Sequence, residues 1–164
     1  MLEGFDQVGV AGVIKHLPGH GRSRADSHFE LPLVSEAAPA LAVDVAPFKA
    51  LASHARMAMT AHLVYQAWDP LRPATLSPTV IGDIIRTEIG FDGVLMTDDI
   101  EMKALDGPVG LRAEQAIAAG CDLVLHCSAE MIGMEEVAAR VGAVSAVSAK
   151  RLAKALPDGP PIGN

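Results

Sequence analysis

The chain has 164 residues, half of them apolar, so it is long enough to bury the core of about one domain. Its 13 Lys and Arg are outnumbered by 20 Asp and Glu, and the formal charge of −7 argues against binding to nucleic acid phosphates or to an anionic membrane. The first six residues lack the basic start and apolar run of a secretory signal, and no stretch approaches the roughly 18 apolar residues that cross a bilayer. We therefore expect a soluble intracellular protein with neither nucleic acid nor membrane as a partner.

Short apolar runs alternate with segments of helical periodicity along the chain. Unbroken apolar runs are typical of parallel strands covered on both faces, and their alternation with helices predicts an α/β protein with a parallel sheet. The expected elements in chain order are the last turns of a helix at 1–10, a strand at Ala11–His16, a helix at Pro47–Ala55, a strand at Ala58–His62, a helix at Pro78–Ile89, a strand at Val94–Thr97, a helix at Leu111–Ala119, a strand at Cys121–His126 and a helix at Glu130–Ala155 with a break near Gly142.

The clearest helix boundaries lie at Ser77-Pro78 and at Gly90. A hydroxyl side chain followed by proline is typical of a helix start, and glycine can take the left-handed conformation that follows a helix end. Between these residues, apolar side chains recur at helical spacing, which predicts one buried face. They are Ile81, Ile84, Ile85 and Ile89.

Each of the four predicted strands ends in polar residues that could take part in catalysis. In a (β/α)8 barrel, the carboxyl ends of the strands carry the active site. A single polar strand end would only mark the return to solvent, but four together favour a functional site at this edge. The strand-end residues are Lys15-His16, Thr60 and His62, Asp98-Asp99, and His126.

A loop rich in histidine follows the first strand. The segments Lys15–Gly21 and Asp26–His28 combine loop-forming Gly and Pro with Lys, His and Asp. Asp26 and His28 are two residues apart, so the carboxylate can bond one ring nitrogen and leave the other facing a substrate. This pattern favours general acid/base catalysis, because an imidazole with a pKa of about 6.5 exchanges protons near neutrality.

A metal site built from this loop is the alternative. His16, His20, His28 and Asp26 are all residue types that bind zinc. Their spacing matches no dense ligand signature, so we expect neither a metal nor another cofactor.

Asp98 and Asp99 follow the third strand, and their side chains should point to opposite sides. One of them could cap the next helix. Alternatively, one carboxylate could act as a nucleophile, with the His28 loop supplying its acid/base partner.

The two cysteines, Cys121 and Cys127, lie at opposite ends of the fourth predicted strand. Six residues of extended chain separate them by roughly 20 Å, beyond disulfide reach. We expect two free, buried thiols.

Together these motifs resemble the family 3 glycoside hydrolases, in particular the bacterial β-N-acetylglucosaminidases (β-hexosaminidases) of peptidoglycan recycling. The match runs from about Phe5 to about Leu125 in the order and spacing of the family. It departs at Leu17, where the family usually has Phe, and at Thr97, where it usually has Ser. The segments that carry the resemblance are Lys15–Gly21, Asp26–His28 with Leu31-Pro32, Met59–His62, Pro73–Ser77, Gly90–Gly93 and Thr97–Met102.

The resemblance implies a retaining, exo-acting hydrolysis of terminal β-linked N-acetylglucosamine through a covalent glycosyl-enzyme. By position in the motifs, Asp98 corresponds to the nucleophile and His28 to the acid/base, with Asp26 as its partner. Most retaining glycosidases pair two carboxylates instead. The resemblance also implies that Lys15 and His16 bind sugar hydroxyls. His20, Arg22 and His62 are expected to shape the loop and the sugar pocket, and His62 is counted with Lys15 and His16 among the substrate-binding residues.

The resemblance covers only part of a barrel. A (β/α)8 barrel takes about 250 residues, so we expect residues 1–156 to form the C-terminal half of one, followed by a loose Pro/Gly-rich tail at 157–164. A family Asp and Arg that bind outer hydroxyls have no counterpart in this sequence. Half a barrel would expose two sheet edges, which predicts a homodimer or the need for the missing half. The alternative function is a non-catalytic sugar-binding remnant.

Overall fold

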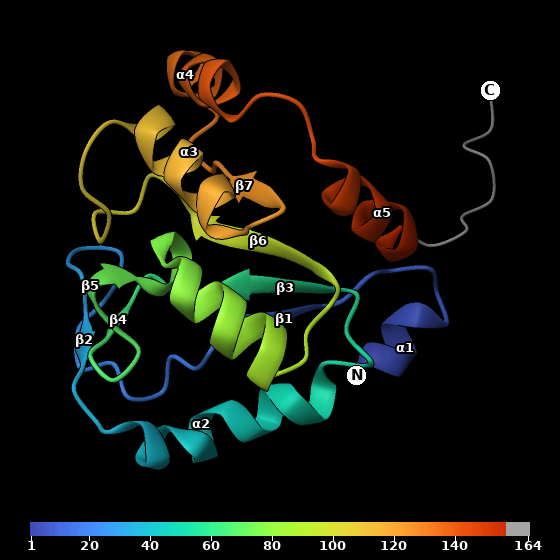
Figure 1. The fold of residues 1–164 in the computed structure, drawn as a ribbon. Coiled ribbons are helices and arrows are strands. Elements are labelled where there is room, and N and C mark those ends of the chain that lie inside the picture. The colour runs from blue at the N-terminus through green and yellow to red at the C-terminus, as the bar shows by residue number, and fades with distance from the viewer. Residues whose placement is uncertain (157–164) are drawn as a thin grey trace.

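The computed structural model describes residues 1–156, and its centre is the predicted parallel sheet (Figure 1). The expected tail at 157–164 lies outside the described residues. The four strands are parallel in the order β1-β3-β6-β7, which is also their order along the chain. They are β1 (Val13–Leu17), β3 (Met57–Thr60), β6 (Val94–Asp99) and β7 (Leu123–Leu125). All four overlap the predicted strands, so the α/β prediction is confirmed.

Helices cover one face of this sheet. Ile14, Ala58 and Leu95 share one register position across β1, β3 and β6, and all three are buried in the core that the helices build. The next register position holds Lys15 and its neighbours, which point to the opposite face. The helices are α1 (Leu2–Asp6), α2 (Ala38–Leu51), η2 (Val80–Glu88), α3 (Val109–Ala119), α4 (Met131–Val141) and α5 (Ala146–Ala155).

The predicted helix boundaries at Ser77 and Gly90 are confirmed. The Ser77 Oγ accepts a hydrogen bond from the Val80 N–H at 3.1 Å, and Gly90 adopts φ +76°. The four isoleucines between them are buried. What the sequence did not predict is the winding of η2 as a π-helix, in which the Ile89 N–H bonds the Ile84 carbonyl five residues back.

The second helix was placed wrongly. Helix α2 begins at Ala38, nine residues before the predicted start, and Pro47 lies inside it rather than at its first turn. Pro39 is the proline that occupies the first turn. The helix tolerates the missing N–H of Pro47 because Leu41 and Val45 anchor it in the core. The expected break in the last helical segment is confirmed, since Gly142 separates α4 from α5.

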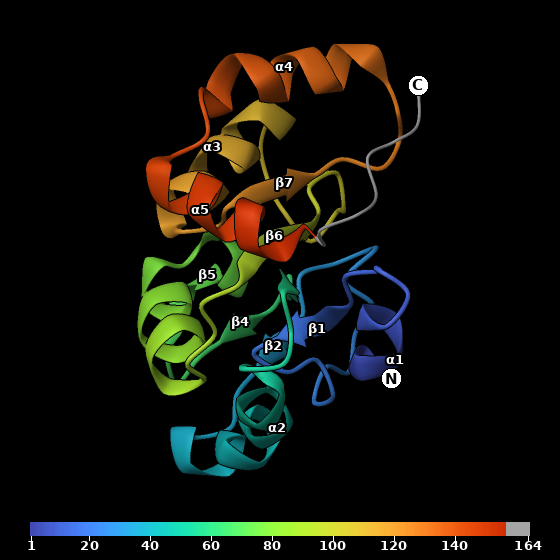
Figure 2. The ribbon, with the colours of Figure 1, turned by 90° about the vertical axis from the view of Figure 1, so that its right-hand side faces the viewer.

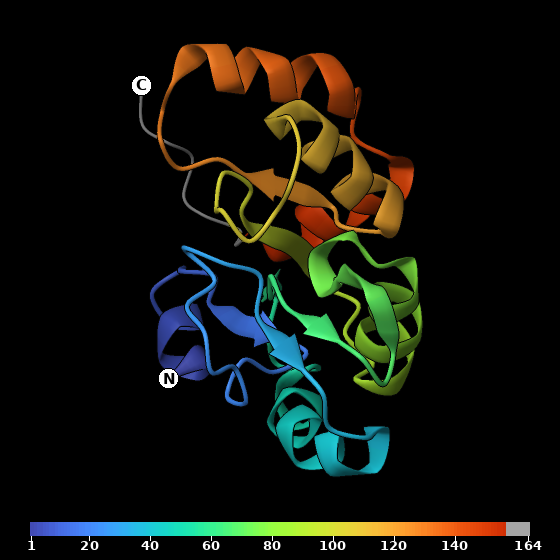
Figure 3. The same ribbon diagram turned by 90° about the vertical axis from the view of Figure 1, so that its left-hand side faces the viewer.

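A second, small sheet lies beside the main one and was not predicted. It has the order β2-β4-β5 and is followed by a short 3-10 turn, η1 (Ala74–Leu76). Two of its strands are two residues long, too short to show an alternating pattern. In Figure 3 this small sheet lies on the side that faces the viewer. Its strands are β2 (Leu33–Val34), β4 (Val64–Tyr65) and β5 (Asp69–Pro73).

Strands β1 and β7 form the two edges of the main sheet within residues 1–156. Figure 2 shows the sheet from the side on which α5 packs against β6. A curved parallel sheet with helices outside and two open edges fits the predicted part of a (β/α)8 barrel. Within the described residues, no helix is long and apolar enough to cross a membrane.

Candidate active site

The side chains of Asp98 and His16 meet at the carboxyl end of the main sheet. Asp98 lies near the end of β6 and His16 near the end of β1, and the Asp98 Oδ2 is 3.4 Å from the His16 Nε2. The other carboxylate oxygen of Asp98 accepts the Asp99 N–H at 2.8 Å. The two side chains are 18% and 27% exposed, so the carboxylate is held and still reachable from solvent.

The surroundings of His16 favour its neutral form. Burial lowers the pKa of His16, and although Asp98 acts to raise it, the net shift is downward with a further contribution from Lys15. The ring of His20 stands edge-on to that of His16, with centroids 5.6 Å apart. A neutral imidazole next to a carboxylate can hydrogen-bond an uncharged hydroxyl, as expected of a sugar-binding group. Lys15 itself is exposed on the open face of the sheet.

His62 is fully buried, and both of its ring nitrogens already have protein partners. Its Nε2 lies 3.0 Å from the Asp99 carbonyl and its Nδ1 lies 2.7 Å from the Thr75 Oγ1. Since a carbonyl only accepts, Nε2 carries the proton and the Thr75 hydroxyl donates to Nδ1. Burial lowers the pKa of His62, which keeps the ring neutral. The polar atoms of His62 therefore hold the Asp99 backbone and the Thr75 hydroxyl, which suits a residue that shapes the pocket, and its role in substrate binding stays a prediction.

The predicted pair of Asp26 and His28 forms in the loop after β1. The His28 Nδ1 is 2.8 Å from the Asp26 Oδ1, and the His28 backbone N–H donates to the same oxygen at 2.9 Å. The backbone N–H and the ring of His28 lower the pKa of Asp26. The side chains are 72% and 57% exposed for His28 and Asp26, respectively. Within residues 1–156, no hydrogen bond or ion pair joins this pair to Asp98.

The loop that carries His28 is fastened at its base. Arg22 donates to the Asp44 carboxylate and to the Ala40 carbonyl on α2. The Tyr65 hydroxyl on β4 donates to the Gly19 carbonyl. The small sheet and α2 therefore anchor the loop, and the expected shaping role of Arg22 has a structural basis.

The alternative metal site is not assembled. Among the described residues, no group of three or more His, Cys, Asp and Glu side chains is placed to hold a metal ion. His20 instead faces Ser27, with its Nε2 3.3 Å from the Ser27 Oγ.

Asp99 caps a turn and not a helix, which corrects one of the two expectations for the Asp pair. Its Oδ1 accepts the Glu101 N–H at 3.2 Å and the Cys127 N–H at 3.3 Å. The next helix, α3, begins only at Val109. Both cysteine thiols are free, as expected. Cys121 is buried as expected, but Cys127 is exposed, contrary to expectation.

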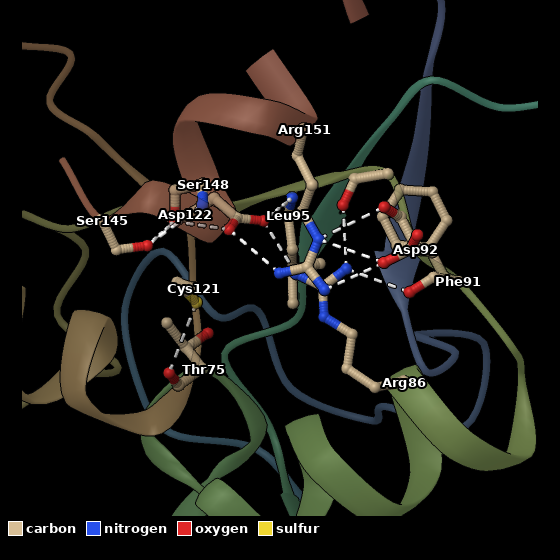
Figure 4. Close-up of polar contacts among 11 residues, drawn as sticks. Thr75, Arg86, Phe91, Asp92, Leu95, Cys121, Asp122, Ser145, Ser148 and Arg151 are labelled. Atoms are coloured by element: carbon tan, nitrogen blue, oxygen red, sulfur yellow. Dashed lines mark hydrogen bonds and ion pairs between the residues drawn. The ribbon is translucent and has the colours of Figure 1, made fainter. Parts of the chain in front are cut away.

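A different polar cluster occupies the amino end of the sheet, where Asp122 precedes β7 (Figure 4). Its carboxylate accepts from Arg86 at 2.8 Å, from Arg151 at 3.2 Å, from the Ser148 hydroxyl at 2.7 Å and from the Leu95 N–H at 2.9 Å. Burial alone would raise the pKa of Asp122, but these donors outweigh it and lower the pKa. Sequence reasoning missed this cluster because its members are far apart along the chain.

Comparison with known proteins identifies a family and several relatives that this chain resembles. The family described as "Glycosyl hydrolase family 3 N terminal domain" matches residues 1–156. A β-hexosaminidase of Alkalilimnicola ehrlichii is 46% identical over 131 residues, covering 77% of this chain and 37% of the relative. A β-hexosaminidase of Stenotrophomonas maltophilia is 41% identical over 135 residues, covering 80% and 40%. The chain thus spans less than half the length of these relatives.

Solved structures give the same result. A family 3 β-N-acetylglucosaminidase from Paenibacillus sp. superposes with a TM-score of 0.85 at 36% identity, covering 93% of this chain and 32% of that protein. NagZ from Neisseria gonorrhoeae, solved with N-trifluoroacetyl-D-glucosamine, superposes with a TM-score of 0.83 at 30% identity, covering 97% and 46%. These findings confirm the resemblance and the partial barrel: the chain belongs to glycoside hydrolase family 3.

Proposed function

We propose that the chain provides the catalytic residues of a retaining, exo-acting β-N-acetylhexosaminidase. The observation that carries the proposal is the Asp98 carboxylate at the carboxyl end of β6, facing His16, with a preformed carboxylate–imidazole pair in the loop after β1. The name of the Paenibacillus relative, a β-N-acetylglucosaminidase, supports N-acetylglucosamine as the sugar.

The proposed reaction has two steps. In the first, the Asp98 carboxylate bonds to the anomeric carbon while the glycosidic C–O bond breaks and His28 gives its proton to the leaving oxygen. In the second, neutral His28 takes a proton from water, the water oxygen bonds the anomeric carbon, and Asp98 is released. Asp26 orients the His28 ring through Nδ1, which leaves Nε2 for proton transfer. Lys15 and His16 bind sugar hydroxyls.

Family resemblance suggests the biological substrate. We propose cell-wall muropeptide fragments carrying a terminal β-linked N-acetylglucosamine, hydrolysed in the cytoplasm. The substrate, compartment and role in peptidoglycan recycling all rest on that resemblance.

The open edges at β1 and β7 favour a partner. Unpaired backbone groups along a parallel strand can join another strand, and exposed apolar residues such as Val10 and Val13 lie by β1. We propose that a second copy of the chain, or the other half of a barrel, covers these edges. The competing function, a non-catalytic sugar-binding remnant, is favoured by the short span of the match to the relatives.

Hydrolysis of 4-nitrophenyl N-acetyl-β-D-glucosaminide separates the two functions. The proposal predicts turnover by the purified chain and its loss, by at least about a thousandfold, in Asp98→Asn. Asp92→Asn is the matched control, because Asp92 lies before the amino end of the same strand and is largely exposed. A folded chain that binds the sugar without turnover would support the remnant, and equal turnover by Asp98→Asn would exclude Asp98 as the nucleophile.

A further inference from the structure

A row of hydrogen bonds continues the pairing of β6 and β7 past the ends of both strands. The Ile100 N–H donates to the Leu125 carbonyl at 2.9 Å, and the Cys127 N–H donates to the Asp99 Oδ1 at 3.3 Å. The segment directly after Asp98 is therefore attached to the segment after β7.

At the end of this row, the Glu101 carboxylate accepts two hydrogen bonds from Ser128. Its Oε2 accepts the Ser128 N–H and its Oε1 accepts the Ser128 hydroxyl, both at 2.9 Å. Hydrogen bonds with an ionised acceptor are about twice as strong as neutral ones. These bonds lower the pKa of Glu101, Ser128 first, with the nearby His126 and Arg112 acting in the same direction.

The ring of His126 packs against the carboxylate of Glu101. Its Nε2 is 3.5 Å from the Glu101 Oε1, and neither ring nitrogen has a hydrogen-bond partner within residues 1–156 although the side chain is more than nine-tenths buried. Gly133 on α4 makes room for the ring, since a Cβ at that position would lie 2.7 Å from Nε2. The His126 ring thus lies between Gly133 and the carboxylate of Glu101 that holds Ser128.

Arg112 holds the same segment from α3. Its guanidinium donates to the carbonyls of Ile100 at 3.0 Å, Met102 at 3.3 Å and Gly107 at 2.8 Å. The turn after Asp98 is therefore fixed from two sides, by α3 and by the segment after β7.

The fixed segment determines the surroundings of Asp98. The Asp99 N–H donates to the Asp98 Oδ1, and the Asp99 carbonyl accepts from His62. If the segment loosened, the Asp99 N–H would turn, and Asp98 would lose the one hydrogen bond that its carboxylate accepts from a backbone N–H within residues 1–156.

We propose that Glu101 is a positioning residue. Its two hydrogen bonds to Ser128, with His126 packed beside them, keep the Asp98 carboxylate directed toward His16. The inference rests on the proposed function, in which Asp98 is the nucleophile. Glu101 touches neither Asp98 nor the substrate in this account.

The first measurement compares the effect of each substitution on kcat with its effect on KM, with the aryl glycoside as substrate. Because misplacing a reacting group by about 1 Å can cost about a hundredfold in rate, Glu101→Ala should lower kcat about ten- to a hundredfold with KM unchanged. Glu101→Gln keeps an acceptor oxygen for Ser128 and should restore most of kcat. Glu114→Ala is the matched control, because Glu114 forms a surface ion pair with Arg140 at 3.0 Å between α3 and α4.

The second readout needs no turnover. Asp98 raises the pKa of His16 against the effect of burial, so a carboxylate that moves away should let the His16 pKa fall. We expect a lower His16 pKa in Glu101→Ala by NMR titration, and the wild-type value in Glu101→Gln and Glu114→Ala. Recovery in the uncharged glutamine variant would show that position matters and not the charge of Glu101. Ser128→Ala provides a milder variant should Glu101→Ala fail to fold.

The two readouts separate this proposal from the proposed function. Unchanged kcat and an unchanged His16 titration in Glu101→Ala would overturn the positioning role. A wild-type chain without turnover would overturn the proposed function, and the His16 titration would still decide whether Glu101 holds Asp98.

Discussion

The two ends of the main sheet each carry an aspartate in a polar cluster, but the clusters are built differently. At the amino end, Asp122 is 2% exposed and receives donors from two arginines, a serine and a backbone N–H. At the carboxyl end, Asp98 is 18% exposed and has one backbone N–H and a histidine at 3.4 Å. The amino end leaves no acceptor oxygen unused, whereas the carboxyl end keeps one oxygen available to a substrate.

Under the proposed function, the amino end of the sheet contributes stability and the carboxyl end contributes chemistry, as is common in barrel enzymes. Substitutions at the two ends should therefore separate activity from stability. A substitution at the amino end that abolished activity without loss of stability, or one at the carboxyl end that mainly lowered stability, would contradict this separation.

The largest expected effect is on catalysis, from His28→Ala. Removing a general acid costs about a hundred- to ten-thousandfold in rate. The loss of kcat/KM, which reports the first step, should be severe for a glycoside with a poor leaving group and small for an activated aryl glycoside, which needs little proton donation. The free energy of unfolding should hardly change, because the side chain is mostly exposed. A loss that is equal for both leaving groups would contradict acid catalysis by His28.

Asp122→Asn should have the largest effect on stability. Breaking a buried ion pair costs about 3–5 kcal/mol, and the substitution leaves Arg86 without its only carboxylate partner among the described residues. Chemical denaturation should show this loss, with turnover by the remaining folded fraction unchanged. Asp92→Asn removes an exposed partner of Arg151 and should cost less than about 1 kcal/mol. Equal costs for both substitutions would contradict the stabilising role of Asp122.

The smallest expected effect is the pH dependence of stability. The folded chain lowers the pKa of His62 and of Asp122, so in both cases the unfolded chain binds the proton more readily. Stability should fall first below about pH 6.5 through His62, and again below about pH 4 through Asp122. Denaturation midpoints between pH 8 and 3 test this, and Asp122→Asn should weaken only the second decline, to which Asp26 and Glu101 also contribute because folding lowers their pKa values too.

Much of the fold could be predicted because each main element has a local signal. Ser77 and Gly90 mark the ends of η2, and the apolar run at Val94–Met96 marks β6. Helix α2 was misplaced because two prolines compete for the first turn, and only tertiary packing of Leu41 and Val45 decides between them.

The site was predictable only where its residues are close in sequence or fit a family motif. The Asp26–His28 pair is two residues apart, and its hydrogen bond was expected. The burial of His62, by contrast, depends on Thr75 and the Asp99 carbonyl, which folding brings together from distant segments. The hydrogen bonds between Glu101 and Ser128 join residues 27 apart in the chain, so no local sequence pattern predicts them.

The central claim is that Asp98 forms a covalent bond to the sugar, and intact-mass spectrometry tests it most directly. The His28→Ala chain is incubated with an N-acetyl-β-glucosaminide that carries an activated leaving group, so that the first step proceeds and the second is slow. We predict a mass gain of one N-acetylhexosaminyl unit that maps to Asp98 and is absent from His28→Ala/Asp98→Asn. Release of sugar without any adduct, or an adduct on another residue, would contradict the account.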